Sequence, residues 1–102
     1  MAKYTIYETS EYRDWFETQT LKSQRQIHSR VLNVELEGHF GHHKFLENNV
    51  WELKFNDGRR IYYAFVPESK IILLLGGNKN GQDKDIKKAA KIFIKIKEIR
   101  SR

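Results

Sequence analysis

The sequence predicts an α+β fold: a small, twisted, mainly antiparallel sheet with two N-terminal helices on one face and a C-terminal helix. Two observations predict this class. Apolar residues alternate with polar ones near the N-terminus and again over residues 50–66, as in strands, whereas residues 10–37 and 81–97 show helical spacing. The 102-residue chain also has one apolar pattern throughout, without repeats or linkers, so we expect a single domain over residues 1–102.

The N-terminal elements are predicted to be a strand and a short helix. Residues 3–8 alternate, with Tyr4 and Ile6 on one face, which is typical of a strand. Ser10 is a favourable N-cap, because its hydroxyl can accept a hydrogen bond from a backbone N–H of the first turn. The helix that it would begin places three aromatic residues on one stripe: Tyr12, Trp15 and Phe16.

A second, longer helix is expected next. Ser23 and Gln26 have the spacing of a capping box and predict its start. Gly38 is the expected end, since glycine readily takes the left-handed conformation that closes a helix. Residues 38–49 are a loop by composition. The inward stripe of this helix comprises Gln24, Ile27, Val31 and Val34.

Three strands and a final helix complete the prediction. Residues 50–55 and 60–66 alternate in polarity, whereas residues 70–75 are apolar on both faces and predict a central, buried strand. The final helix is expected to start near Asn80 or Gly81. Its inward face comprises Ile86, Ala89, Ala90, Phe93 and Ile96.

The turn between the first two of these three strands determines their register. A two-residue Asp-Gly loop would set Lys54 opposite Ile61, a charge beside a core residue. A three-residue loop at 56–58, with Gly58 in the left-handed region, avoids this conflict. It pairs Phe55 with Arg59, Leu53 with Ile61, Trp51 with Tyr63, and Lys54 with Arg60.

This register brings Lys54, Arg60 and Tyr62 together on the face of the hairpin away from the apolar residues. Like charges directly opposite each other cost roughly 0.2–1 kcal/mol, so their pairing suggests a face that binds an anion. One interpretation is a site that binds or cleaves phosphate. The other is a solvated face neutralised by Glu52, and the pattern alone leaves both open.

The segment G-G-N-K-N-G at 76–81 is predicted to be a tight turn from strand to helix. It lacks the spacing of a nucleotide-binding P-loop. Asn80 would cap the helix with Asp83 at its third position, and Lys79 would lie beside the helix N-terminus, where anions are favoured. The helix beyond it carries a lysine stripe that either is a solvated face or contacts nucleic acid: Lys84, Lys87, Lys88, Lys91 and Lys95.

Composition narrows the classes of function. The 19 basic and 13 acidic residues give a net charge of +6, which favours polyanionic partners. The absence of cysteine excludes disulfides, a thiol nucleophile and cysteine-ligated zinc. The N-terminus has no apolar segment typical of a signal peptide, and the longest apolar run, residues 71–75, is too short to span a membrane. We therefore expect a cytoplasmic protein with no membrane partner.

Three histidines, His39, His42 and His43, lie in the predicted loop. No cysteine or nearby aspartate completes a ligand set, so we expect neither a metal site nor a cofactor. Because imidazole titrates near neutral pH, one of them could act as a general acid or base.

Four motifs resemble those of the addiction-module killer proteins, a branch of the RelE/ParE toxin superfamily. They occur in the order and spacing of that family over about the last 60 residues, and the preceding strand and two helices also agree. The motifs are G-H-H-K-F-L (41–46), V-W-E-L-K-F (50–55), R-R-I-Y-Y (59–63) and L-L-L-G-G-N-K-N-G-Q-D-K-D-I (73–86).

The resemblance implies a β-α-α-β-β-β-α fold and the toxin of a type II toxin–antitoxin system. It implies a metal-independent endoribonuclease that cuts mRNA on the ribosome. A cognate antitoxin would neutralise it, and we expect a helix-turn-helix protein with an acidic segment. Two alternatives stay open: a ParE-like inhibitor of DNA gyrase, and a plain nucleic-acid-binding module. The final helix carries no C-terminal tyrosine or histidine of the catalytic kind found in some members, which leaves the acid and base open.

The resemblance also implies site residues at the positions that match the family motifs. The main positions are Lys44, Lys54, Arg60 and Lys79, with Tyr62 and Gln82 secondary. Substrate contacts are expected from Lys44 and Gln82 and, on the final helix, from Lys84, Lys87, Lys88 and Lys91.

The chemistry implied by the resemblance is in-line cleavage, in which the RNA 2′-OH attacks the neighbouring phosphorus. Arg60 and Lys79 would stabilise the charge that builds on the non-bridging oxygens, because preformed donors aimed at developing charge are usually the largest catalytic term. Lys54, beside the positive charge of Arg60, would take the 2′ proton. Tyr62 or His43 would protonate the leaving oxygen.

Overall fold

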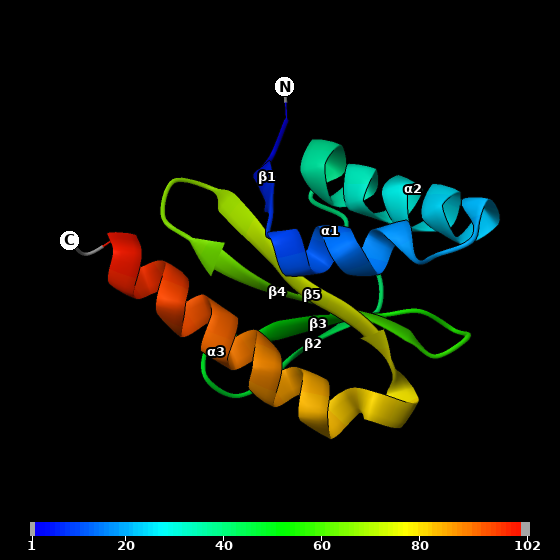
Figure 1. The fold of residues 1–102 in the computed structure, drawn as a ribbon. Helices are drawn as coiled ribbons and strands as arrows, with labels where there is room; N and C mark the ends of the chain where they lie inside the picture. The colour runs from blue at the N-terminus through cyan, green and yellow to red at the C-terminus, as the bar shows by residue number, and fades with distance from the viewer. Residues whose placement is uncertain (1, 101–102) are drawn as a thin grey trace.

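Five strands form one mixed sheet (Figure 1). The computed structural model describes residues 2–100. Across the sheet the strand order is β1-β5-β4-β3-β2; β1 runs parallel to β5, and the other neighbouring pairs are antiparallel. The strands are β1 (Thr5–Glu8), β2 (His43–Phe45), β3 (Trp51–Lys54), β4 (Arg59–Val66) and β5 (Lys70–Asn78).

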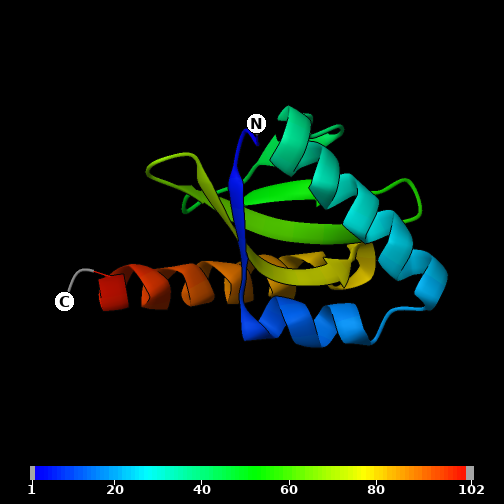
Figure 2. The ribbon, with the colours of Figure 1, turned by 90° about the horizontal axis from the view of Figure 1, so that it is seen from above.

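Three helices cover the two faces of this sheet (Figures 1 and 2). α1 (Ser10–Glu17) and α2 (Leu21–Glu37) cover one face, and α3 (Gln82–Arg100) crosses the other. The predicted α+β class and the placement of the two N-terminal helices are therefore confirmed. Among residues 2–100, no helix is both long enough and apolar enough to cross a membrane.

Each face of the sheet has its own hydrophobic core. On the α1–α2 side, Tyr12 and Ile27 pack against Leu53, Ile61 and Tyr63, all of them buried. These sheet residues occupy alternate positions of β3 and β4, as the period of two requires. The aromatic stripe of α1 and the apolar stripe of α2 therefore pack where the sequence predicts.

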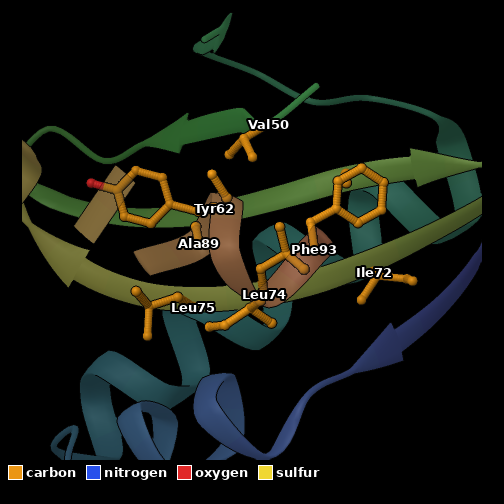
Figure 3. Packing of buried hydrophobic residues seen from close by; sticks show 10 residues of the cluster. Val50, Tyr62, Ile72, Leu74, Leu75, Ala89 and Phe93 are labelled. Atoms are coloured by element: carbon orange, nitrogen blue, oxygen red, sulfur yellow. The ribbon is translucent and has the colours of Figure 1, made fainter. Parts of the chain in front are cut away.

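On the α3 side, Tyr62 and Leu74 of the sheet pack against Ala89 and Phe93 (Figure 3). β5 supplies apolar residues to both cores, so its prediction as a buried interior strand is confirmed. The inward stripe predicted for α3 is also confirmed, because all of its members pack in this core: Ile86, Ala89, Ala90, Phe93 and Ile96.

The β3–β4 hairpin has the predicted register. Gly58 has φ 103° in the left-handed region, and the Phe55 amide donates to the Arg59 carbonyl at 3.0 Å. Lys54 is paired with Arg60, and the remaining pairs also match. The three-residue loop is therefore correct, and the apolar pattern decides the register even though it sets two cations side by side.

Both helix N-caps lie earlier than predicted. Thr9, not Ser10, caps α1, because its Oγ1 accepts from the Tyr12 amide at 3.0 Å. Thr20 caps α2 in the same way, accepting from the Ser23 amide at 3.1 Å, so the helix begins two residues before Ser23. Gly38 ends α2 as predicted, with φ 66°.

The predicted loop at 38–49 contains strand β2, which the sequence reading missed. β2 is only three residues long and lies at the edge of the sheet, where it pairs with β3 alone. A strand of three residues is too short to show a recognisable alternation of apolar and polar residues.

The predicted turn at 76–81 is wrong in its first half, because β5 continues through Gly76 and Gly77 to Asn78. A short 3-10 turn, η1 (Lys79–Gly81), then leads into α3. Asn78, not the predicted Asn80, caps this turn, because its Oδ1 accepts from the Asn80 amide at 2.9 Å. A Cβ on Gly76 would lie 2.0 Å from the Trp15 ring, and one on Gly77 would lie 2.1 Å from the Asp85 carboxylate. The glycine pair therefore admits one close-packed side chain on each face of the strand, rather than making a turn.

Candidate nucleic-acid interface

A basic groove runs between α2 and the β3–β4 hairpin. Its volume is about 810 Å³, and the residues that line it include three arginines, a lysine and a histidine: Arg25, Arg30, Arg59, Lys54 and His42. Asp57 is the one carboxylate among the lining residues. The groove therefore concentrates positive charge in a concave surface, which favours a polyanion.

Arg30 of α2 holds the wall of this groove together. Its Nη1 donates to the Lys54 carbonyl and its Nη2 to the His42 carbonyl, each at 2.8 Å, while Nε donates to the Phe40 carbonyl at 3.1 Å. The guanidinium also lies over the Phe55 ring, 4.8 Å from its centroid. Arg30 thereby joins α2 to β3 and to the segment that leads into β2.

Arg59 joins the hairpin to the start of α2. Its Nη1 donates to Ser23 Oγ and its Nη2 to Gln26 Oε1, each at 2.7 Å, and its Nη2 lies 2.8 Å from Asp57 Oδ2. The hydrogen bonds from Arg59 hold the pKa of Asp57 below its usual range, so the one carboxylate of the groove stays paired. Arg59 also lies over Phe55, on which both arginines therefore stack.

The sheet face that carries Arg60 and Glu52 is buried under α3 rather than open to solvent. Arg60 is 8% exposed, and its Nε lies 2.9 Å from Oε1 of the fully buried Glu52. Nε has no well-aligned hydrogen bond among the described residues, so the contact is an ion pair. Gln82 of α3 donates to both Glu52 oxygens, at 3.0 and 2.9 Å. Both interpretations of this face, a phosphate site and a solvated face, expected it to be open to solvent, and both are wrong in this respect because α3 covers Arg60 and Glu52.

Tyr62 lies inside the α3 core, away from solvent (Figure 3). Burial, and then the nearby carboxylates of Glu52 and Asp85, raise the pKa of its hydroxyl. The hydroxyl has no hydrogen-bond partner among the described residues. Tyr62 thus shares a strand face with Arg60 but does not reach the surface.

Lys54 and Lys79 both lie near the tip of the hairpin. Lys54 is half-buried and pairs with Arg60, which in turn pairs with Gly77 of β5. Lys79 is exposed, and its amide donates to the Gly58 carbonyl at 2.8 Å while its side chain lies along Gly58. Two strand spacings of about 4.8 Å separate β3 from β5, so the two lysines flank one corner of the sheet.

A second cavity, of about 510 Å³, opens at this corner where α3 begins. Lys79, Gln82 and Lys84 are among the residues that line it. The cavity lies at the N-terminal end of α3, where unpaired backbone N–H groups favour an anion. Lys79 therefore lies between the hairpin tip and this cavity.

His43 lies on the other side of the sheet from Arg60. Its Nδ1 is 2.8 Å from the Tyr63 hydroxyl, and its ring stacks between Phe40 and Trp51 at centroid distances of 4.9 and 5.3 Å. Burial, and then the charges of Arg30 and His42, lower the pKa of His43. The neutral imidazole thus forms part of an aromatic row, and the structure does not bring it together with Lys54 and Lys79.

The remaining predicted site residues lie at the surface. Lys44 pairs with Glu52 on the edge strand β2 and is exposed. The whole lysine stripe lies on the solvent side of α3: Lys84, Lys87, Lys88, Lys91 and Lys95. Within residues 2–100, no three His, Asp or Glu side chains lie close enough together to hold a metal ion.

Sequence reasoning missed the groove residues Arg25, Arg30 and Arg59. Arg25 and Arg30 lie on α2, outside the motifs, and their proximity to the hairpin depends on how α2 crosses the sheet. Arg59 could have been predicted as a groove residue, because the predicted register already pairs it with Phe55 next to the turn of the hairpin.

Comparisons with known proteins agree with this architecture. Residues 14–100 match the family described as phage-derived protein Gp49-like (DUF891). An uncharacterized protein of Haemophilus influenzae is 32% identical over 87 residues, which cover 82% of this chain and 87% of that protein.

Solved structures with a similar fold are toxins and toxin–antitoxin complexes. A double mutant of the E. coli toxin RelE in the free state has a TM-score of 0.68 at 14% identity and covers 88% of this chain and 95% of its own. The intact E. coli RelBE toxin–antitoxin complex has a TM-score of 0.62 at 13% identity, and the match covers 74% of this chain and 95% of that chain. The RelBE2 toxin–antitoxin complex of Mycobacterium tuberculosis has a TM-score of 0.64 at 14% identity, and the match covers 74% of this chain and 98% of that chain. The chain therefore belongs to the Gp49-like family and has the fold of the RelE toxins.

Proposed function

We propose that this protein is the toxin of a type II toxin–antitoxin system and that it cleaves mRNA bound to the ribosome. The observation that carries the proposal is the basic groove, which leads along the hairpin to the corner flanked by Lys54 and Lys79. The fold supports the toxin class, since the solved structures that share it include a toxin–antitoxin complex.

In this proposal the RNA backbone lies in the groove. Arg30 and Arg59 donate to protein groups, so they contribute positive potential more than free hydrogen-bond donors. Arg25 and His42 are exposed and can contact phosphates directly. Such contacts hold any RNA sequence, because phosphates carry no sequence information.

Cleavage would follow the in-line path at the corner. The RNA 2′-OH attacks the neighbouring phosphorus and passes its proton to the Lys54 amine. The bond to the 5′ oxygen breaks, and that oxygen takes a proton from the Lys79 ammonium, which leaves a cyclic phosphate and a free 5′-OH. Lys79 and the start of α3 stabilise the charge on the non-bridging oxygens.

Arg60 has a positioning role in this scheme. Its guanidinium is buried against Glu52, and Gln82 ties the same carboxylate to the first turn of α3. This network sets β3, β4 and α3 relative to one another, and therefore Lys54 relative to the Lys79 turn. Tyr62 and His43 drop out of the proposed chemistry, because one is buried and the other lies on the opposite face.

We further propose that a cognate antitoxin with an acidic segment covers the basic groove, and that both proteins act in the cytoplasm, where the mRNA is translated. The net charge of +6 favours an acidic partner. A helix-turn-helix domain on that partner is an expectation from the family resemblance alone.

Cell-free translation with primer extension tests the activity. Wild-type protein is expected to give defined mRNA ends only when ribosomes are present, and Lys54→Ala and Lys79→Ala each to lower the cleavage rate by about 10²–10³. Lys3→Ala, a change far from the corner, is the matched control. Intact mRNA together with trapped cleavage of supercoiled DNA by gyrase would replace the proposal with the ParE-like alternative.

A further inference from the structure

A further cavity lies far from the proposed cleavage corner, beside the C-terminal half of α3. Its volume is about 420 Å³, and Asn49, Trp51, Phe65, Val66, Phe93 and Lys97 are among the residues that line it. The cavity forms because β3 begins at Trp51, which pairs with Tyr63, so β4 runs on without a partner on that side. Val66 at this end of β4 and Lys97 in the last turns of α3 both line the cavity.

The chemistry of the lining is aromatic with polar groups at the rim. Trp51 and Phe65 make an edge-to-face pair, with ring centroids 5.6 Å apart, and Phe65 is 37% exposed. The Lys97 ammonium lies over the Phe93 ring, 4.8 Å from its centroid. A flat apolar group that enters here meets aromatic rings, while an anion attached to it meets the ammonium of Lys97.

The rim of the cavity includes the turn between β2 and β3. Asn48 and Asn49 are the central residues of this turn, with φ 59° and 63°, and the Val50 amide donates to the Glu47 carbonyl at 3.2 Å. Two-residue hairpin turns require positive φ, and asparagine tolerates it well. Asn49 thereby brings an amide, with both donors and an acceptor, to the edge of an aromatic cavity.

The lysine stripe of α3 connects this cavity to the cleavage corner. Gln82 and Lys97 are 15 residues apart on one helix, which corresponds to about 22 Å. Lys84, Lys87, Lys88, Lys91 and Lys95 lie exposed between them. A single strand of RNA that follows these lysines from the corner would bring a nucleotide to the cavity.

We propose that the cavity binds one unpaired nucleobase of the substrate RNA, several nucleotides away from the scissile bond. The base stacks on the exposed Phe65 ring and meets the Trp51 ring, which stands perpendicular to Phe65, through its edge. The Asn49 amide meets the edge of the base, and Lys97 meets the adjoining phosphate. Aromatic stacking of this kind accepts any base and adds affinity in single-stranded RNA binding. The inference deepens the proposed function, since it names a further contact of the same substrate.

Trp51 provides a direct readout, because the chain contains only one other tryptophan, Trp15, which packs against Gly76 of β5 and does not line the cavity. Full-length protein would be titrated with a single-stranded RNA octamer and with octamers in which one nucleotide at a time is abasic. We expect RNA to change the Trp51 emission and one abasic position to abolish that change. Trp51→Phe should remove the signal.

Two variants test the contacts without touching the corner. Phe65→Ala and Lys97→Gln are expected to weaken octamer binding, the first by about 5- to 140-fold, the range of one lost base stack. The controls are Tyr7→Ala, an exposed aromatic on β1 away from the cavity, and Lys3→Gln. Circular dichroism and urea unfolding confirm that each variant is folded.

The outcomes separate this inference from the proposed function. Ribosome-dependent cleavage by a protein whose Trp51 emission ignores RNA, and whose Phe65→Ala variant binds normally, overturns the base site and leaves the nuclease intact. A position-specific emission change without any cleavage supports the base site and removes the nuclease. A response to an acidic antitoxin peptide but not to RNA assigns the cavity to a protein and overturns the inference.

Discussion

Gly76 and Gly77 show how much two adjacent residues can decide. Neighbouring strand residues point to opposite faces, so one glycine accepts the Trp15 ring of α1 and the other accepts the Asp85 carboxylate of α3. Both helices therefore approach β5 closely at the same point along the strand. The first carboxylate side chain to face the sheet from α3 is desolvated there, which raises the pKa of Asp85.

At this scale we expect Gly76→Ala to lower the free energy of unfolding by about 1–3 kcal/mol, the usual cost of overpacking. The Trp15 ring is rigid, with its nearest atoms 2.0–2.4 Å from the added Cβ. Gly77→Ala should cost less, since the Asp85 carboxylate can rotate away. Urea denaturation measures both, with Gly81→Ala as the control, where the nearest atom lies at 3.5 Å. Equal effects at positions 76 and 81 would contradict the packing argument.

Secondary-structure elements were predictable where a long apolar–polar pattern was combined with a well-defined turn or capping residue. The hairpin register followed from Leu53 and Trp51 needing apolar partners, and α2 ended at the expected glycine. The burial of Arg60 and Tyr62 was not predictable in the same way. Their strand face reads as polar, and nothing local in the sequence says that the apolar stripe of α3 packs on it. The sequence therefore predicted Lys54 and Lys79 near one corner of the sheet, where the structure has them, but wrongly expected Arg60 and Tyr62 to be exposed beside them. The role of this corner stays a prediction.

Capping gives a test at the scale of an element. Thr9 caps α1 and its hydroxyl also lies 3.0 and 2.8 Å from the carbonyl oxygens of Leu73 and Leu74, so it ties the helix start to β5. Thr9→Ala should lower the free energy of unfolding by about 0.5–2 kcal/mol, measured by urea denaturation. Ser10→Ala, at the position first expected to be the cap, should change it by less than about 0.5 kcal/mol. A larger effect at Ser10 than at Thr9 would contradict the cap assignment.

Charge acts at the scale of the whole molecule. The basic groove and the lysine stripe lie on different sides of the sheet, and both reach the corner at the hairpin tip and the start of α3. The net charge of +6 is thus arranged so that one long polyanion could touch both surfaces.

The salt dependence of RNA binding measures how many of these charges engage. Changing Lys87, Lys88 and Lys91 together to glutamine should weaken binding and reduce the slope of log affinity against log salt by about 2, since each single-strand phosphate contact contributes roughly 0.7. The single-turnover cleavage rate at saturating substrate should stay nearly unchanged. Lys3→Gln is the control. A wild-type slope in the triple variant would show that the stripe is only a solvated helix face.

The parallel pairing of β1 with β5 has a consequence for synthesis. Thr5 pairs with Lys70, and β5 then continues to Asn78 before α3 closes the second core. β1 is the first strand of the sheet to be synthesised and β5 is the last, so the sheet cannot close while residues 70–78 are still untranslated. Contacts so distant in sequence also form slowly. Neither Lys79 nor the start of α3 exists in its final place until then. A chain proposed to attack translating ribosomes is thus inactive during most of its own translation.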